Sequence, residues 1–556
     1  MPRPRVLVIG LDGATWDLIG PWMDAGKLPN LAGLVTNGTT SKLMSTVPPV
    51  SPAAWSSFMT GKNPGKHGIF DFTLRDFHNY GMRVAPRPSE PTLWGLLSAW
   101  QRQVCIMNVP QTYPPEAVNG IMVTGLGTPS QARFTHPAAL EEILRRRHYR
   151  MATDRTPQKD AAADFIQDVL QVSEEVTDVA IHLLGQVDWD LGMVVLRLTD
   201  EIPHFFWHAM DVAHPAHPVA GDTGQRAVER AYRKADELVG KLASAAAGRE
   251  TTLLVVSDHG FGPLHKDVYL NAWLEQGGFL KMRHHLPPQA LAARVMQRLG
   301  LTRSQMGQTL GRWGMDRLRG ALRDGLGKWG RVFPNDAQLR VGDLVDWSRT
   351  RAYSVGYIGQ IYVNLAGRDP QGVVAPGAEY EQTLAELTDA LMQMVDPEDG
   401  LPVVERVLRK EEVYSGRHLA DAPDLLVQMR GFSYITRQAF EFGRTGQVFA
   451  PPPTQETGGH RPEGILLASG AGILPGQRLE SARIEDMAPT ILYLLGCPVP
   501  SDMDGRVLAE IIAGPAIGSQ PVSYCDPPLE GHAAESLSAD EEQRVMEHLR
   551  RLGYIG

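Results

Sequence analysis

Short, uninterrupted runs of apolar residues recur along this chain, and long segments with the apolar spacing of helices separate most of them. The runs lie at residues 6–9, 104–107, 193–196, 253–256 and 465–467. Strands that are apolar on both faces and alternate with helices are typical of a parallel sheet covered on both sides. The sequence therefore predicts a large, doubly wound, mostly parallel α/β sheet with helices on both faces, among them residues 160–184, 225–246 and 485–495.

Length and composition bound the domain organisation. The chain has 556 residues, 43% hydrophobic and 21% charged, which is typical of a globular protein. This length gives room for about three to four domains, or for one large α/β domain with insertions. We expect a core in two parts, residues 1–275 and 341–515, the second of which carries His460. A basic helical insertion at 276–340 separates them, and a tail with a short helix follows at 516–556.

The predicted insertion is strongly basic. Between Lys281 and Arg331 the chain has eleven Lys and Arg against Asp316 and Asp324, a net charge of +9. One interpretation is an ordinary solvated helical face. The other, which we expect, is a cap whose cations meet an anionic substrate or a lipid head group.

Charge and cysteine content exclude some classes of function. The net charge of −9 argues against a general nucleic-acid-binding surface, so we expect no specific nucleic-acid partner. Three dispersed cysteines are too few for a disulfide framework or a cysteine-built zinc site. The apolar runs are too short for a signal peptide or a membrane span. We therefore expect a soluble, cytoplasmic protein without a transmembrane segment, and peripheral membrane contact stays open.

Asp and His side chains lie next to four of the apolar runs. They are Asp12 after the first run, Asp200 and His204 after the third, Asp258 and His259 after the fourth, and His460 just before the last. In parallel sheets the strands end at one edge, where ligands bind, so these residues can meet there. Asp200 and His204 are four apart and share one face of a helix. Three carboxylates and three imidazoles suit Zn²⁺ or Mn²⁺.

A candidate nucleophile lies in the stretch from Thr46 to Gly61. Its prolines favour an extended loop up to Pro52, followed by a helix at residues 53–59. Ser51 would then lie near a helix N-terminus, where amide groups and the macrodipole favour a phosphate. The alternative interpretation is that Ser51 only caps the helix.

The order of these motifs resembles a known family. The motifs are Asp12, residues 51–61 with residues 63–69 behind them, the pair at 200 and 204, the pair at 258 and 259, and His460. They resemble the alkaline phosphatase superfamily and, more narrowly, its type I phosphodiesterase/nucleotide pyrophosphatase branch. The resemblance covers residues 6 to about 270 and about 340 to 510, and leaves out the basic insertion.

The resemblance implies a metal-dependent hydrolase of phosphoric esters with two divalent metal ions, Zn²⁺ or, as the alternative, Mn²⁺. One ion would be held by Asp200, His204 and His460, and the other by Asp12, Asp258 and His259. Ser51 would attack phosphorus and form a phosphoseryl intermediate that water then hydrolyses. The implied substrate is a small-molecule or lipid-like phosphoester.

The sequence departs from the family at two positions. The family commonly has Thr where this chain has Ser51. In eukaryotic nucleotide pyrophosphatases an Asn binds a phosphate oxygen. By gap-free counting its position corresponds to Phe72 of this chain, which cannot donate a hydrogen bond, and the neighbouring Asp71 does not replace it. We therefore expect Asn108 or Lys266 to bind substrate in its place.

Three other functions remain as alternatives. A sulfatase is disfavoured because residues 51–55 do not match the Cys/Ser-x-Pro-x-Arg pattern of that group. A phosphomutase of the same superfamily is the second. The third is a catalytically silent member that binds an anionic lipid or partner through the basic insertion.

Overall fold

The computed structural model describes residues 3–129, 132–157, 160–218, 224–247, 250–283, 344–436, 447–452, 456–513, 521–531 and 537–552. The basic segment from Lys281 to Arg331 lies almost wholly outside these residues, so its helical structure and its role as a cap stay predictions. Within the described residues, no helix is both long enough and apolar enough to span a membrane.

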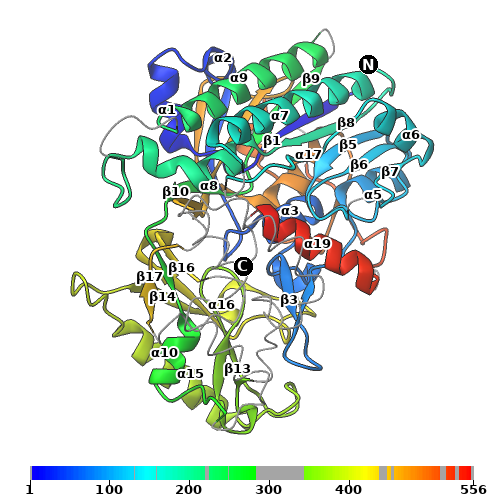
Figure 1. The fold of residues 1–556 in the computed structure, drawn as a ribbon. Helices are drawn as coiled ribbons and strands as arrows, with labels where there is room; N and C mark the ends of the chain where they lie inside the picture. The colour runs from blue at the N-terminus through cyan, green and yellow to red at the C-terminus, as the bar shows by residue number, and fades with distance from the viewer. Residues whose placement is uncertain are drawn as a thin grey trace.

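A nine-stranded sheet forms the centre of the larger part of the molecule (Figure 1). All five predicted runs lie in it. Its strands, in spatial order, are β20 (Gln477–Arg483), β2 (Gly38–Met44), β19 (Glu463–Gly470), β9 (Thr251–Val256), β1 (Arg5–Leu11), β8 (Leu191–Leu196), β5 (Val104–Val109), β6 (Gly120–Thr124) and β7 (Thr135–His136). Neighbouring strands are parallel except at β19, which is antiparallel to both β2 and β9, and at β7.

Helices cover both faces of this sheet, which confirms the predicted fold class. On one face a single apolar cluster includes side chains of α1 (Trp16–Asp24), α2 (Pro29–Thr36), α7 (Ala162–Leu184), α8 (Leu198–Met210) and α9 (Ala227–Ala246). On the other face a second cluster includes side chains of α3 (Ser51–Thr60), α5 (Leu93–Ala99) and α17 (Met487–Leu494). The three predicted helices correspond to α7, α9, and α17 with the short helix η4 (Ile484–Asp486) before it.

A second, smaller sheet lies below the main sheet in Figure 1 and has its own apolar core. Its strands, in spatial order, are β12 (Ala352–Ser354), β13 (Gln360–Val363), β15 (Leu425–Met429) and β14 (Val404–Arg409). Side chains of α10 (Leu270–Gln276) and α15 (Ala378–Met392) pack in this core. Residues 341–515 thus build a separate sheet before they supply β19 and β20 to the main one, and the domain boundaries stay a prediction.

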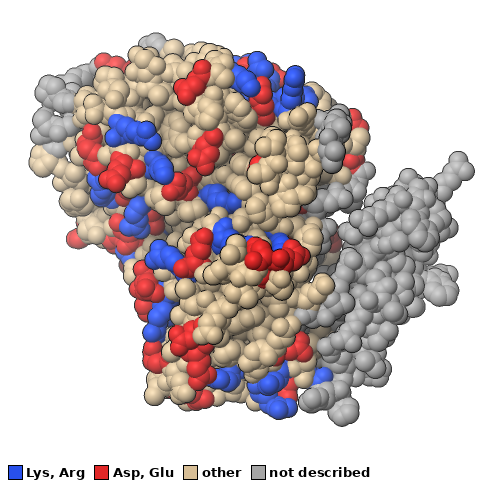
Figure 2. All heavy atoms as spheres, turned by 90° about the vertical axis from the view of Figure 1, so that its left-hand side faces the viewer, with Lys and Arg blue, Asp and Glu red and all other residues tan. Residues whose placement is uncertain are grey.

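The remaining elements lie outside the two sheets and the helices named above. They are β3 (Thr73–Arg75), β4 (Met82–Val84), α4 (Pro64–His67), α6 (Ala139–Arg146), β10 (Gly260–Pro263), β11 (Lys266–Val268), η2 (Trp347–Arg349), α16 (Lys410–Val413), η3 (Arg430–Phe432), β16 (Tyr434–Ile435), β17 (Phe449–Ala450), β18 (Gly458–Arg461), β21 (Val499–Pro500), η5 (Ala509–Ile511), β22 (Tyr524–Cys525) and α19 (Ala539–Leu552). On the face drawn in Figure 2, basic and acidic side chains are interspersed, without a large patch of one sign among the described residues.

Gly10 of β1 sets how closely α3 approaches the main sheet. A Cβ atom at this position would lie 2.7 Å from the Trp55 ring and 2.8 Å from Val195. We expect Gly10→Ala to lower the free energy of unfolding by about 1–3 kcal/mol, because the packed ring must move. Urea unfolding measures this. Gly20→Ala in α1 is the control, since its added methyl group meets nothing within 4 Å, and an equal loss in both variants would contradict the packing argument.

Candidate active site

Three neighbouring strands of the main sheet end at one place, and each is followed by an acidic residue. Asp12 follows β1, and its backbone N–H donates to the carbonyl of Leu196 at the end of β8, 2.9 Å away. Asp200 lies in the first turn of α8, directly after β8, and Asp258 follows β9 by two residues. All three are at most 1% exposed. The order β9, β1, β8 therefore collects three buried carboxyl groups at the carboxyl edge of the sheet.

His460 reaches this edge from a segment about 200 residues later than His259. It lies on β18, which pairs with β10, and β10 begins directly after Asp258 and His259. The pairing sets His460 opposite Phe261 and stacks its ring on that of His259, with centroids 3.7 Å apart. The structure thus brings together all six Asp and His side chains that the sequence singled out.

Asp200, His204 and His460 form the first group. Oδ1 of Asp200 lies 3.2 Å from Nε2 of His204 and 3.4 Å from Nε2 of His460. The two Nε2 atoms are 3.1 Å apart. Each ring has its other nitrogen next to a backbone carbonyl: Nδ1 of His204 is 3.2 Å from Gly458 O, and Nδ1 of His460 is 2.9 Å from Pro49 O.

These contacts fix the protonation of the two rings. A carbonyl oxygen only accepts hydrogen bonds, so each Nδ1 carries the proton. Burial, followed by the charge of His259, lowers the pKa of His460 to about 3, so this ring is neutral and its Nε2 carries a lone pair. With both Nδ1 atoms facing carbonyls, the two Nε2 atoms point toward each other at 3.1 Å, so that one cation could bind both. The first group therefore fits a divalent metal ion, with Nδ1 contacts of the kind that orient ligating histidines.

Asp12, Asp258 and His259 form the second group. Nε2 of His259 lies 3.5 Å from Oδ1 of Asp12 and 3.4 Å from Oδ2 of Asp258, while its Nδ1 donates to Gly260 O at 3.0 Å. Ligand atoms of Asp12, Asp200 and His259 also lie within 4.8 Å of one another. Asp200 therefore reaches both groups, an overlap that the sequence did not indicate.

The electrostatics of this edge favour bound cations. Burial, and then repulsion from Asp258 and Asp200, raises the pKa of Asp12 well above its usual value. Burial and repulsion from Asp200 raise the pKa of Asp258 to about 7. Burial would also raise the pKa of Asp200, but His204 and His460 outweigh it and lower this pKa. Oδ1 of Asp12 accepts no hydrogen bond from the described residues. Divalent cations would relieve this crowding of buried negative charge.

Ser51 lies beside the second group. It is the first residue of α3, with Val50 as the N-cap, so the helix begins two residues earlier than predicted and Ser51 is not its cap. Its hydroxyl lies 3.1 Å from Nε2 of His259 and donates a hydrogen bond to the Asp258 carboxylate. One turn along α3, the Trp55 indole N–H donates to Oδ2 of Asp12 at 3.2 Å. Sequence reasoning missed this contact, although Trp55 stands four residues after Ser51.

The two residues predicted to bind substrate have other contacts. Nδ2 of Asn108, at the end of β5, donates to Val195 O at 3.0 Å. Nζ of Lys266 pairs with Asp396 at 2.6 Å and Glu398 at 2.5 Å, beside the second sheet. Neither set of contacts involves Ser51 or the six Asp and His residues, and both assignments stay predictions.

Arg461, the residue after His460, also lay outside the sequence predictions. Its guanidinium donates to the carbonyls of Phe432, Gly459, His460 and Pro263. Burial lowers its pKa to about 10. These bonds connect β18 to β10 and to η3, and so hold in place the segment that contains His460.

His67 is a buried histidine outside the metal groups. Its Nε2 lies 3.0 Å from the Ser57 hydroxyl and its Nδ1 accepts from the Ile69 N–H. Burial, and then the charges of His418 and Lys62, lowers its pKa from 6.5 to about 3. Between these values the unfolded chain binds a proton that the folded chain does not, so stability falls as the pH drops.

We expect the titration of His67 alone to lower the free energy of unfolding by about 2 kcal/mol as the pH falls from 7 to 5. In His67→Gln, which carries no titrating ring, the difference in unfolding free energy between these pH values should shrink by that amount. Urea unfolding of both proteins at both pH values measures it. The same pH dependence in the two proteins would contradict a neutral, buried His67.

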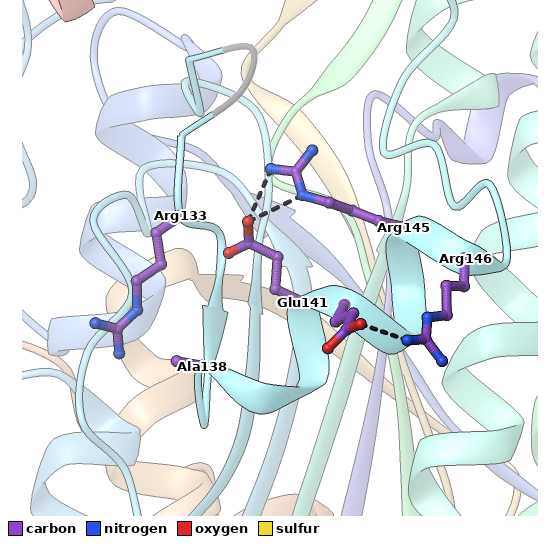
Figure 3. A pocket seen from close by; sticks show the side chains of 6 residues that line it. Arg133, Ala138, Glu141, Arg145 and Arg146 are labelled. Carbon is purple, nitrogen blue, oxygen red and sulfur yellow. Dashed lines mark hydrogen bonds and ion pairs between the residues drawn. The ribbon is translucent and has the colours of Figure 1, made fainter.

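A surface hollow of ≈ 710 Å³ lies at the α6 helix, away from these residues. It is lined by Arg133, Ala138, Glu141, Glu142, Arg145 and Arg146. Figure 3 shows that Glu141 pairs with Arg145. Glu142 pairs with Arg146, so the lining charges largely neutralise each other. The site at the sheet edge, with its buried carboxylates and imidazoles, is the better candidate for chemistry.

Comparison with known proteins finds a family that matches most of the chain. A family described as Type I phosphodiesterase / nucleotide pyrophosphatase matches residues 6–444, a span that contains Ser51 and ends before His460. No curated protein matches the chain. The solved structure of human ectonucleotide pyrophosphatase/phosphodiesterase 5 is 11% identical, with a TM-score of 0.46 over 92% of this chain and 100% of that one. An inactive form of the murine protein, in complex with AMP, is 12% identical, with a TM-score of 0.45 over 89% and 95%.

Proposed function

We propose a mechanism for this chain from one premise: it belongs to the type I phosphodiesterase/nucleotide pyrophosphatase family, as its motifs predicted, and is a phosphoric ester hydrolase. In this proposal, two divalent metal ions and Ser51 carry out the hydrolysis of a small-molecule or lipid-like phosphoester. The observation that carries it is the 3.1 Å separation of Nε2 of His204 and Nε2 of His460, whose Nδ1 atoms both face carbonyls.

The metal ions would be held by the two groups at the sheet edge. Asp200, His204 and His460 would hold one ion, and Asp12, Asp258 and His259 the other, with Asp200 near both. Oxygen and nitrogen donors of this kind favour Zn²⁺, with Mn²⁺ as the alternative. Bound divalent ions would supply positive charge for the oxygens that enter and leave phosphorus.

Ser51 would be the nucleophile. As its Oγ forms a bond to phosphorus, the bond from phosphorus to the leaving oxygen breaks, and the released alcohol or phosphate takes up the proton that Ser51 gives up. Water then attacks the phosphoseryl group, donates a proton to Oγ and restores Ser51. The N-terminus of the ten-residue helix α3 favours the negative charge of the phosphoryl group. Trp55 holds Asp12 in place during these steps.

A substrate screen tests this function. Metal-loaded protein is incubated with p-nitrophenyl phosphate, bis(p-nitrophenyl) phosphate and p-nitrophenyl sulfate, and release of nitrophenol is followed. We expect turnover of the phosphodiester and little or none of the sulfate ester. Turnover of the sulfate ester alone would favour a sulfatase, and bound metal without turnover of any ester would favour a silent binding protein.

We also propose that the protein acts in the cytoplasm. The support is the three cysteines at 105, 497 and 525, all free thiols, which suit a reducing compartment.

A further inference from the structure

Two buried hydroxyl groups lie directly before two of the three carboxylates at the sheet edge. Thr199 precedes Asp200, and Ser257 precedes Asp258. Both hydroxyl residues are fully buried. They follow β8 and β9, the strands on either side of β1, so they flank the segment that carries Asp12.

The Thr199 hydroxyl bonds to the turn that follows β1. Its Oγ1 donates to the carbonyl oxygen of Asp12, 2.7 Å away. The Asp12 N–H in turn donates to the Leu196 carbonyl at the end of β8. The hydroxyl therefore adds one more hydrogen bond between the two segments just beyond the strand ends, beside Asp200.

The Ser257 hydroxyl has contacts on three segments. It lies 2.8 Å from Ala14 O, in the same turn, and 2.8 Å from His259 O, the two acceptors for its single proton. It also accepts a hydrogen bond from the Ile465 N–H at 3.0 Å, on β19, which begins three residues after His460. One hydroxyl group thus joins the turn after β1, the end of its own strand and the segment that follows His460.

The turn at residues 12–14 contacts the other two carboxylate residues as well. The Gly13 N–H donates to Oδ1 of Asp258 at 3.3 Å. A Cβ atom on Gly13 would lie 3.2 Å from the Cβ atom of Asp200, so the turn packs closely on that residue. A shift of this turn would therefore change the spacing of all three carboxylates.

We propose that Thr199 and Ser257 are positioning residues, whose hydroxyl groups hold the turn at residues 12–14 so that the second group keeps the spacing that binds a divalent ion. The proposal rests on the proposed function and adds two residues that the function does not use. Neither hydroxyl is a metal ligand in it. Removing an outer contact that orients a ligand commonly lowers metal affinity about 10–100-fold.

Thr199→Val tests the first hydroxyl, because valine has nearly the same shape without the oxygen. We expect the dissociation constant of one Zn²⁺ ion to rise about 10–100-fold. The other ion should bind as in wild type, since the rings of His204 and His460 are held by other contacts. Titration of the metal-loaded protein with a chromophoric chelator measures both constants without any turnover. Thr199→Ser keeps the hydroxyl and should restore wild-type binding.

Ser257→Ala should weaken the same ion by a similar factor, because it frees the same turn from the other side. Thr177→Val is the matched control. Thr177 is also fully buried, and its hydroxyl donates to Ser173 O within α7 at 2.9 Å. This control should lower the free energy of unfolding about as much as Thr199→Val, since each removes one buried hydrogen bond, and should leave both dissociation constants unchanged.

Three results would overturn the proposal. Unchanged dissociation constants in either Thr199→Val or Ser257→Ala would show that the hydroxyl only supports the fold. An equal loss of affinity for both ions, or the same loss in Thr177→Val, would show that metal binding follows general stability. A loss in Thr199→Ser as large as in Thr199→Val would assign the effect to the methyl group. Failure of the proposed function is distinguishable, because wild-type protein would then bind fewer than two ions or turn over no phosphoester.

Discussion

Replacing Ser51 with alanine is expected to lower kcat by about three to six orders of magnitude, the largest effect of any single substitution considered for this protein. The proposed reaction needs the Oγ atom for its covalent step, and 1% exposure leaves little room for water to take its place. The fold and the bound metal should survive, because alanine fits a helix and Ser51 is not the cap of α3. Steady-state kinetics, thermal melting and elemental analysis measure the three quantities.

Ser56→Ala is the matched control for this experiment. Ser56 is also fully buried and lies on the same helix, so the substitution should leave kcat close to the wild-type value. Mass spectrometry of acid-quenched turnover should place a phosphoryl group on the peptide that carries Ser51. Unchanged activity in Ser51→Ala, or phosphate on another residue, would transfer the role to Thr46, Ser56 or Ser57.

Removal of metal is expected to have the second largest effect. Chelation should abolish turnover, because three buried carboxylates would then face an anionic phosphoester without compensating charge. His460→Ala should lose one of two bound ions and most of kcat, since it removes one of three candidate ligands of the first group and the ring stacked on His259. Elemental analysis and kinetics of the same preparations measure both.

His67→Gln serves as the control for His460→Ala. His67 is equally buried, but its partners are Ser57 and Ile69, so this variant should retain both ions. Active wild-type protein with well under one metal ion per chain would contradict the two-metal proposal. Retention of two ions in His460→Ala would show that His460 is not a ligand.

Local patterns in the sequence were enough for the main sheet. The apolar runs at β1, β5, β8, β9 and β19 are short and continuous because their residues are buried on both faces, and that pattern needs no knowledge of distant contacts. The same reasoning located Asp12, Asp200 and Asp258, because a polar residue directly after such a run must lie at the edge of the sheet.

Contacts between distant segments could not be predicted in this way. The overlap of Asp200 with both groups depends on the register of β1, β8 and β9, and no residue next to Asp200 in the sequence indicates it. Tyr357 and Asp71 are 286 positions apart, and their hydrogen bond exists only when the second sheet has folded. Lys266 begins β11, and its charge is matched by Asp396 and Glu398, which lie far along the chain.

The place of β19 in the main sheet has a consequence for biosynthesis. This strand fills the position between β2 and β9, yet it emerges from the ribosome about 200 residues after β9. At about 5–20 residues per second, the two inner edges stay unpaired for about 10–40 s. Unpaired edges of apolar strands can join other chains. A nascent chain that stops before residue 463 would therefore leave β9 as an open edge of the sheet and β2 without either of its neighbours, β19 and β20. We expect such fragments to aggregate or to bind chaperones.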